Sequence, residues 1–229
     1  MPAAKIDPII CTVDVVLLCL HEQALHVLLQ RREREPFKAA WALPGGYIHA
    51  QIDQDARDAA ERVLRDKLGV SSPYLEQLAT FSGPGRDPRG WSVSIAYFAL
   101  VSAETLSQAQ PGAELRPITR LPGLPFDHKA IVDAAVARLR TKSLYSSLPV
   151  HLLGPQFTLP QLQAVYEAVL GERLNKVSFR RKVDELGMLQ AIPGAMEGGR
   201  ANRPAQLYRL RPQFVHSLSL LERGLGARG

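Results

Sequence analysis

The chain has 229 residues and a formal net charge of +6, with 46% hydrophobic and 22% charged residues, as in folded globular proteins. No apolar run reaches the roughly 18 residues of a transmembrane helix, and the N-terminus lacks the order of a secretory signal, so membrane association is not expected. The two cysteines, Cys11 and Cys19, share one extended segment in which they do not face each other, which predicts a cytoplasmic protein without disulfides.

The first part of the chain alternates strand patterns with two helical patterns. Apolar alternation and β-branched residues predict strands, whereas apolar residues at helical spacing predict helices. The predicted strands are Pro8–Leu20, Ala24–Gln30, Tyr74–Phe81, Trp91–Val101 and Ala113–Pro117, and Trp41–Tyr47 is predicted as a short strand that runs into a glycine loop. The predicted helices are Asp53–Leu68 and Asp127–Leu139. This order predicts an α+β fold in which a sheet lies between helices, an α/β/α sandwich.

The pattern changes after residue 142. Residues 143–155 lack periodicity and contain Ser, Pro and Gly, which predicts a linker between a domain of residues 1–142 and one of residues 156–229. Thr158 and Gln161 form a capping box before a first helix, and a second helix runs from about Lys176 to Leu186. Two strands then flank a Gly- and Arg-rich loop, Pro193–Pro204, and this order is that of a winged helix-turn-helix.

A glycine loop followed by a helix in the first domain resembles a Nudix box. In that family a helix after the loop carries an Arg and several Glu, which hold divalent cations against a diphosphate. The residual box positions are Gly46, Arg62, Asp66 and Gly69, whereas Val63 and Lys67 stand where glutamates are expected. We therefore expect no catalytic residues, no metal site beyond Asp66 as the one carboxylate in register, and no cofactor, with Mg²⁺ bound only if some hydrolysis persists.

The loss of carboxylates does not prevent binding, because arginines suit phosphate recognition. Any single arginine among the candidate residues could equally be a surface charge that binds no ligand. The candidate effector-binding residues are Arg31, Arg32, Gly45, Gly46, Arg62, Arg86, Asp87 and Arg89.

The excess positive charge lies in the second domain. From Ser143 onward there are 11 Lys and Arg against 6 Asp and Glu, a pattern of phosphate-backbone binders, although a solvated surface gives the same excess. A basic second helix and a basic wing favour contact with DNA. The candidate DNA-binding residues are Asn175, Lys176, Ser178, Arg180, Arg181, Lys182, Arg200, Asn202 and Arg203.

The order of motifs closely resembles the NrtR-type family of Nudix-related transcriptional regulators. The matching pieces include Thr12-Val-Asp14-Val-Val, Trp41-Ala-Leu-Pro-Gly-Gly, Arg62-Val-Leu-Arg-Asp-Lys, Leu75-Glu-Gln-Leu, Gly85-Arg-Asp-Pro-Arg, Phe126-Asp-His128, Phe157-Thr-Leu, Asn175-Lys, Phe179-Arg-Arg-Lys and Arg203-Pro-Ala-Gln-Leu-Tyr208. The resemblance implies a homodimeric repressor that binds a double-stranded DNA operator and releases it when ADP-ribose or a related NAD metabolite binds. It also implies that many members have lost catalysis.

Three alternatives stay open at this point. The chain could be an active Nudix pyrophosphohydrolase of ADP-ribose or another nucleoside diphosphate derivative, with the second domain used for dimerisation. It could be a regulator of the same architecture that responds to sugars. It could also be a protein-interaction adaptor, which the C-terminal charge excess and the Arg-rich wing disfavour.

Overall fold

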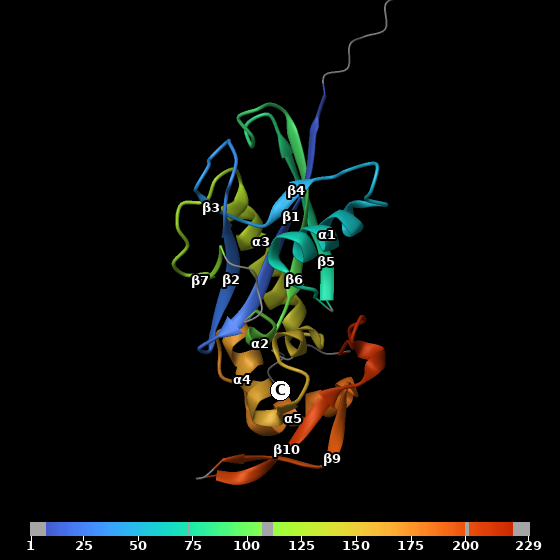
Figure 1. Ribbon diagram of the computed structural model, residues 1–229. Helices are drawn as coiled ribbons and strands as arrows, with labels where there is room; N and C mark the ends of the chain where they lie inside the picture. The colour runs from blue at the N-terminus through green and yellow to red at the C-terminus, as the bar shows by residue number, and fades with distance from the viewer. Residues whose placement is uncertain (1–7, 73, 107–111, 200–201, 222–229) are drawn as a thin grey trace, which may run out of the picture.

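The computed structural model describes residues 8–72, 74–106, 112–199 and 202–221 (Figure 1). Figure 1 shows a sheet-based unit above a smaller unit of helices and a long hairpin, with α1 and α3 on opposite faces of the sheet. The predicted α+β architecture is confirmed. None of the helices in the described ranges is long and apolar enough to cross a membrane.

A seven-stranded mixed sheet organises the first unit. Five strands follow the order β3-β2-β1-β6-β5, while β4 pairs with β1 and β7 with β2, and only the β1–β6 pair is parallel. The elements are β1 (Ile10–His21), β2 (Ala24–Arg31), β3 (Trp41–Ala42), β4 (Gly45–Tyr47), α1 (Ala56–Leu68), β5 (Tyr74–Gly83), β6 (Ser92–Leu100), α2 (Ala103–Leu106), β7 (Ala113–Pro117) and α3 (His128–Ser143).

The central strand β1 divides the interior into two cores. Side chains alternate across a strand, so Val13, Val15 and Leu17 pack with α1, while Val16 and Leu18 pack on the face covered by α3. Both faces of β1 are buried, which explains why its sequence is almost continuously apolar.

The second unit contains two α-helices and a hairpin, and it has its own core. Its sheet has the order β8-β10-β9. Phe157, Tyr166 and Phe179 are fully buried at its centre, and the Tyr166 and Phe179 rings meet edge to face. The elements are β8 (Phe157–Thr158), α4 (Leu159–Leu170), α5 (Lys176–Leu186), β9 (Leu189–Gly199), β10 (Asn202–Leu210) and a short 3-10 turn, η2 (Pro212–Phe214).

The segment predicted as a linker, 143–155, is instead a packed part of the structure. The helix α3 continues to Ser143, and a 3-10 helix, η1 (Leu148–Leu152), follows it with all five residues buried. Leu148 and Leu152 join the core on the α3 face of the sheet, together with Val165 and Val169 of α4. The two units therefore share apolar packing through α4, because hydrophobic residues outweigh the turn-forming Ser and Pro that suggested a loop.

The predicted loop Pro193–Pro204 is also corrected, because most of it is strand. The strand β9 runs on to Gly199 and β10 begins at Asn202. As β9 lies at the edge of its sheet, Pro193 sits where a missing N–H is tolerated. The pairing of β9 with β10 contains two register shifts, which accommodate the residues that interrupt regular pairing.

Candidate effector pocket and nucleic-acid interface

A cavity of about 550 Å³ opens in the first unit beside the glycine loop. Its walls come from β1, β2, β4, the end of α1, the loop between β5 and β6, and the start of α3. Seven of the eight predicted effector residues line it, namely Arg31, Arg32, Gly45, Gly46, Arg86, Asp87 and Arg89. The cavity size and its polar walls suit a small anionic molecule.

The glycine at position 45 is required by the close approach of two strands. Gly45 pairs with Asp14 across β4 and β1, and a Cβ there would lie 2.1 Å from Asp14 Oδ1 and 2.8 Å from the Val13 carbonyl oxygen. Gly46 is less crowded, since a Cβ there would meet a Val63 methyl group at 3.4 Å. The glycine loop thus forms a wall of bare backbone against the cavity.

A buried carboxylate, Asp14, forms the floor of the cavity. It accepts a hydrogen bond from Ser94 Oγ at 2.6 Å, and it lies 3.4 Å from the Arg86 guanidinium and 3.5 Å from His128 Nε2. Although burial opposes ionisation, His128, Ser94 and Arg86 together hold the pKa of Asp14 below its usual range. The floor therefore carries a negative charge that is already paired.

The helix α3 begins at this floor. Arg86 donates to both carboxylate oxygens of Asp127, at 2.9 and 3.0 Å, and its side chain is only 7% exposed. The next residue, His128, accepts a hydrogen bond from the Leu43 N–H at Nδ1. One end of α3 is thus fixed to groups that line the cavity.

The remaining arginines surround the opening of the cavity. Arg89 binds Asp87 through two contacts of 2.6 and 3.0 Å, and these bonds raise the pKa of Arg89 above its usual value. Arg31 lies over the Trp41 ring at 4.5 Å. Arg32 lies over the Phe126 ring at 4.9 Å. Aromatic stacking holds both guanidinium groups in place with donors left over for a ligand.

Arg62 differs from the other predicted effector residues, since it does not line the cavity. Its guanidinium donates to Asp53 at 2.6 and 2.8 Å and to the Tyr47 carbonyl oxygen at 3.0 Å. The Arg62 hydrogen bonds are the largest cause that lowers the pKa of Asp53 to about 2. Arg62 therefore fixes the loop between β4 and α1, and its role in the structure is one of support.

The helix α1 and its surroundings present few groups that could bind a metal ion. Val63 is 1% exposed and packs in the core under α1. Asp66 lines the cavity and accepts a hydrogen bond from Arg65 at 3.0 Å. Lys67 also lines the cavity and donates to the Gly45 carbonyl oxygen. Among the described residues, no group of three His, Cys, Asp or Glu side chains is placed to hold a metal ion, so this donor set does not fit Mg²⁺.

Several cavity residues were missed by the sequence reasoning. Tyr47 is 45% exposed and hydrogen-bonds Arg89, and Phe126 contacts Phe37 edge to face at 5.0 Å. The Phe126-Asp127-His128 motif was identified as a family match, but nothing in its spacing places it beside Asp14. These aromatic rings offer flat surfaces on which a base could stack.

The helix α5 presents a basic face to solvent. Phe179, Val183 and Leu186 point into the core, so the predicted DNA-binding residues Lys176, Ser178, Arg180 and Arg181 are exposed, and Lys182 is half-buried. Asn175 caps the helix, and its Oδ1 accepts from the N–H groups of residues 177 and 178. Val177, which was not predicted, is 77% exposed on the first turn of this face.

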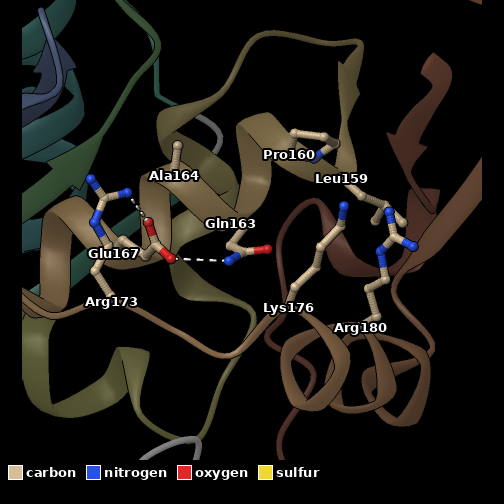
Figure 2. Close-up of a pocket in the computed structure, with 8 residues that line it drawn as sticks. All are labelled: Leu159, Pro160, Gln163, Ala164, Glu167, Arg173, Lys176 and Arg180. Atoms are coloured by element: carbon tan, nitrogen blue, oxygen red, sulfur yellow. Dashed lines mark hydrogen bonds and ion pairs between the residues drawn. The ribbon is translucent and has the colours of Figure 1, made fainter. Parts of the chain in front are cut away.

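A groove of about 300 Å³ lies between α4 and α5 in the same unit (Figure 2). Figure 2 shows Lys176 and Arg180, one helical turn apart, both reaching toward the start of α4 at Leu159 and Pro160. On the other side of the groove, Glu167 pairs with Arg173 at 3.2 Å and accepts from Gln163 at 3.0 Å. No ion pair of Lys176 or Arg180 is present within the described residues, and two such cationic ends suit a phosphate backbone.

The described residues do not include positions 200–201, at the tip of the wing. Arg200 is outside the described residues, and for Asn202 and Arg203 only the backbone, at the start of β10, is described. Their predicted contacts with DNA remain predictions.

Two protein-family models match the chain. The NUDIX domain model covers residues 12–133, and the NrtR DNA-binding winged helix domain model covers residues 149–210. The predicted Nudix-like fold followed by a winged helix is thereby confirmed. The second match begins inside the segment predicted as a linker, in agreement with the packing of η1.

Three relatives are informative. The chain is 40% identical over 208 residues to an ADPR responsive transcriptional repressor, NtrR, of Acinetobacter baylyi, covering 88% of this chain and 82% of that protein. It is 38% identical to Shewanella oneidensis NrtR crystallised with a 27mer DNA, with a TM-score of 0.85 over 94% of this chain and 99% of that one. The NUDIX domain of the Shewanella protein, complexed with ADP ribose, matches 61% of this chain and 94% of its own length at 35% identity, with a TM-score of 0.53. An ADP-ribose pyrophosphatase of Methanocaldococcus jannaschii is 31% identical over 133 residues, which cover 57% of this chain and 71% of that protein.

Proposed function

Since the chain belongs to the NrtR family of Nudix-domain transcriptional regulators, we propose that it is a repressor that senses ADP-ribose. Its Nudix domain binds the effector in the cavity beside the glycine loop, and its winged helix binds a double-stranded DNA operator through α5 and the wing. The DNA and ADP-ribose complexes of the Shewanella relative support both partners.

One observation carries the choice of a sensor over an enzyme. The chain keeps the ligand cavity of a Nudix domain while Val63 and Lys67 replace the side chains that would hold a metal. A metal-activated water is the nucleophile that such a hydrolysis needs. Without it the cavity binds its ligand and releases it intact, so no cofactor is assigned.

The helix α3 connects the two activities. Its first turn is held by Arg86 and His128 contacts at the cavity, while near its other end Arg140 donates to the Val169 carbonyl oxygen at the end of α4, at 3.2 Å. Tyr166 of α4 also donates to the Ser146 carbonyl oxygen at 2.7 Å. A ligand that moves the start of α3 therefore acts on the DNA-binding unit through direct contacts. In a cytoplasmic homodimer, this movement changes the spacing of the two winged helices, which must match the operator half-sites.

Two measurements on the full chain test this function. Calorimetry with ADP-ribose tests effector binding, and gel shifts with a duplex selected by the protein from a random library test DNA binding and its release by ADP-ribose. Binding of both, with reciprocal weakening, is expected. If ADP-ribose leaves the gel shift unchanged, the sensor role for that ligand is wrong.

The second candidate function is that of an active ADP-ribose pyrophosphatase, which the Methanocaldococcus relative favours. Product analysis with ADP-ribose and Mg²⁺ distinguishes the two. We expect no product at the rates of ordinary enzymes. A turnover of about 1 per second or more would assign the chain to the hydrolases.

A further inference from the structure

The end of the Nudix helix places a cation in the wall of the effector cavity. Lys67 lies in the last turn of α1, and its ammonium reaches across to the glycine loop, where it donates to the Gly45 carbonyl oxygen. In the described part of the chain its ammonium forms no ion pair at contact distance. Its one hydrogen-bond partner is a neutral carbonyl, so its charge is available to a ligand.

Two arginines of the cavity, Arg86 and Arg89, differ from Lys67 in this respect, whereas Arg31 and Arg32 also donate to neutral carbonyl oxygens. Arg86 is held by Asp127 and Arg89 by Asp87, so each of these charges is already paired. Partial burial in the cavity wall, and next the neighbouring Arg32, lower the pKa of Lys67. The carboxylates of Asp14 and Glu33 act in the opposite direction but do not outweigh these causes.

The same wall does not accept a divalent metal. The Asp14 carboxylate is bonded to Ser94 and Arg86, and Asp66 accepts from Arg65. Among the described residues, no third His, Cys, Asp or Glu side chain joins them to form a metal site. A lysine ammonium beside Asp66 would also repel a divalent cation.

We propose that Lys67 is the built-in counterion of this cavity, which contacts the diphosphate of a nucleoside diphosphate ligand in place of a divalent metal ion. The inference rests on the proposed function of the cavity as an effector site. Lys67 supplies one positive charge on a flexible stem, with donors that suit phosphate oxygens. Unlike a metal ion, it generates no hydroxide nucleophile, so the ligand is bound without being cleaved. Affinity is therefore independent of divalent metal.

Calorimetry on the full chain tests this proposal with ADP-ribose as the probe, in buffer with Mg²⁺ and in buffer with EDTA. The variants are Lys67→Met and Lys67→Glu, with Arg57→Met as the control, because Arg57 lies on the same helix and neither it nor its ion-pair partner Glu61 lines the cavity. Thermal melts without ligand show whether each variant is folded.

The wild-type protein is expected to bind ADP-ribose equally in both buffers. Lys67→Met should lose about 10- to 100-fold in affinity in both, the worth of one charge-assisted hydrogen bond, while Arg57→Met stays at the wild-type value. Lys67→Glu should bind most weakly in EDTA and recover in part with Mg²⁺. Loss of wild-type binding in EDTA, or wild-type affinity in folded Lys67→Met, overturns the proposal.

A second probe separates this proposal from the choice of effector. If ADP-ribose binds in neither buffer, the proposed effector is wrong, and ADP is titrated in its place. ADP binding in EDTA that depends on Lys67 upholds the counterion role for another nucleoside diphosphate. Failure of ADP to bind the wild-type protein overturns it as well.

Discussion

Replacing Asp127 by Asn should strengthen ADP-ribose binding and weaken its effect on DNA. Asp127 precedes α3 and does not line the cavity, but both its carboxylate oxygens accept from Arg86, which does. An anionic ligand that reaches Arg86 must compete with Asp127 for the same donors. The loss of this competitor lowers the cost of ligand binding and detaches the start of α3 from the cavity.

The expected change in ADP-ribose affinity follows from the strength of the Arg86–Asp127 pair, which the substitution weakens. Hydrogen bonds between charged groups contribute about 1.5–3 kcal/mol net, and the pair is poorly screened because the two side chains are 7% and 24% exposed. An Asn keeps one acceptor oxygen but loses the charge and the second acceptor, so a loss of about 1.4 kcal/mol is expected, or about tenfold in affinity. The start of α3 is not otherwise harmed, because Asp127 makes no side-chain cap bond to the helix and Asn is an equally good cap residue.

Calorimetry with ADP-ribose measures the first effect, and fluorescence anisotropy of a selected duplex with and without ADP-ribose measures the second. In the wild-type protein the effector should change DNA affinity by about 5- to 150-fold, and this factor should be smaller in the variant. Asp133→Asn is the matched control, since Asp133 lies on the outer face of the same helix and pairs only with Lys129. Unchanged or weaker ADP-ribose binding by a folded Asp127→Asn protein refutes the competition between ligand and Asp127.

Three further outcomes are expected. Arg181→Ala should weaken DNA binding for all sequences and reduce the slope of log affinity against log salt by about one, as gel shifts at several salt concentrations will show; an unchanged slope removes Arg181 from the interface. Gly45→Ala should cost about 1–3 kcal/mol or more in urea unfolding, because its Cβ would overlap Asp14, whereas Gly85→Ala meets no atom within 4 Å and serves as the control. Burial, and then His216, lower the pKa of His151 to about 4, so below pH 6.5 only the unfolded chain gains this proton. Stability should therefore fall by up to about 3 kcal/mol between pH 6.5 and 4, and His151→Phe should lose that part of the pH dependence.

Most of the fold could be predicted from local patterns in the sequence. The apolar face of α1, its end at Gly69 in the left-handed conformation, and the Thr158–Gln161 capping box all depend on residues within a few positions of each other. The linker and the bounds of the loop in the wing were mispredicted because tertiary contacts override local composition there. Gln206, for example, donates its side-chain amide to the carbonyl oxygens of Ile192 and Ala195, which stabilises the irregular hairpin from 14 and 11 residues away.

The candidate site, in contrast, depends mostly on contacts between residues that are far apart in the sequence. Its arginines could be proposed from residue type alone, but their partners could not. Arg86 meets Asp127 from 41 residues away and Asp14 from 72 residues away. Spacing carries no signal for such contacts, because they depend on how β1, the β5–β6 loop and α3 meet in space. For the same reason Arg62 could not be separated from the arginines that line the cavity.

The position of Val63 bears on whether a glutamate could be accommodated there. A Glu at this position would place a carboxylate against Gly46 and in the core with Leu17 and Leu64, where Val63 is now 1% exposed. A buried side chain of this size contributes about 1.5–3 kcal/mol, and an unpaired buried charge costs more than that. Lys67 adds a second obstacle, since its ammonium occupies the wall where a metal would need oxygen ligands. Both observations support the proposed role of the cavity, which is to hold a diphosphate ligand unchanged, as a reversible signal requires.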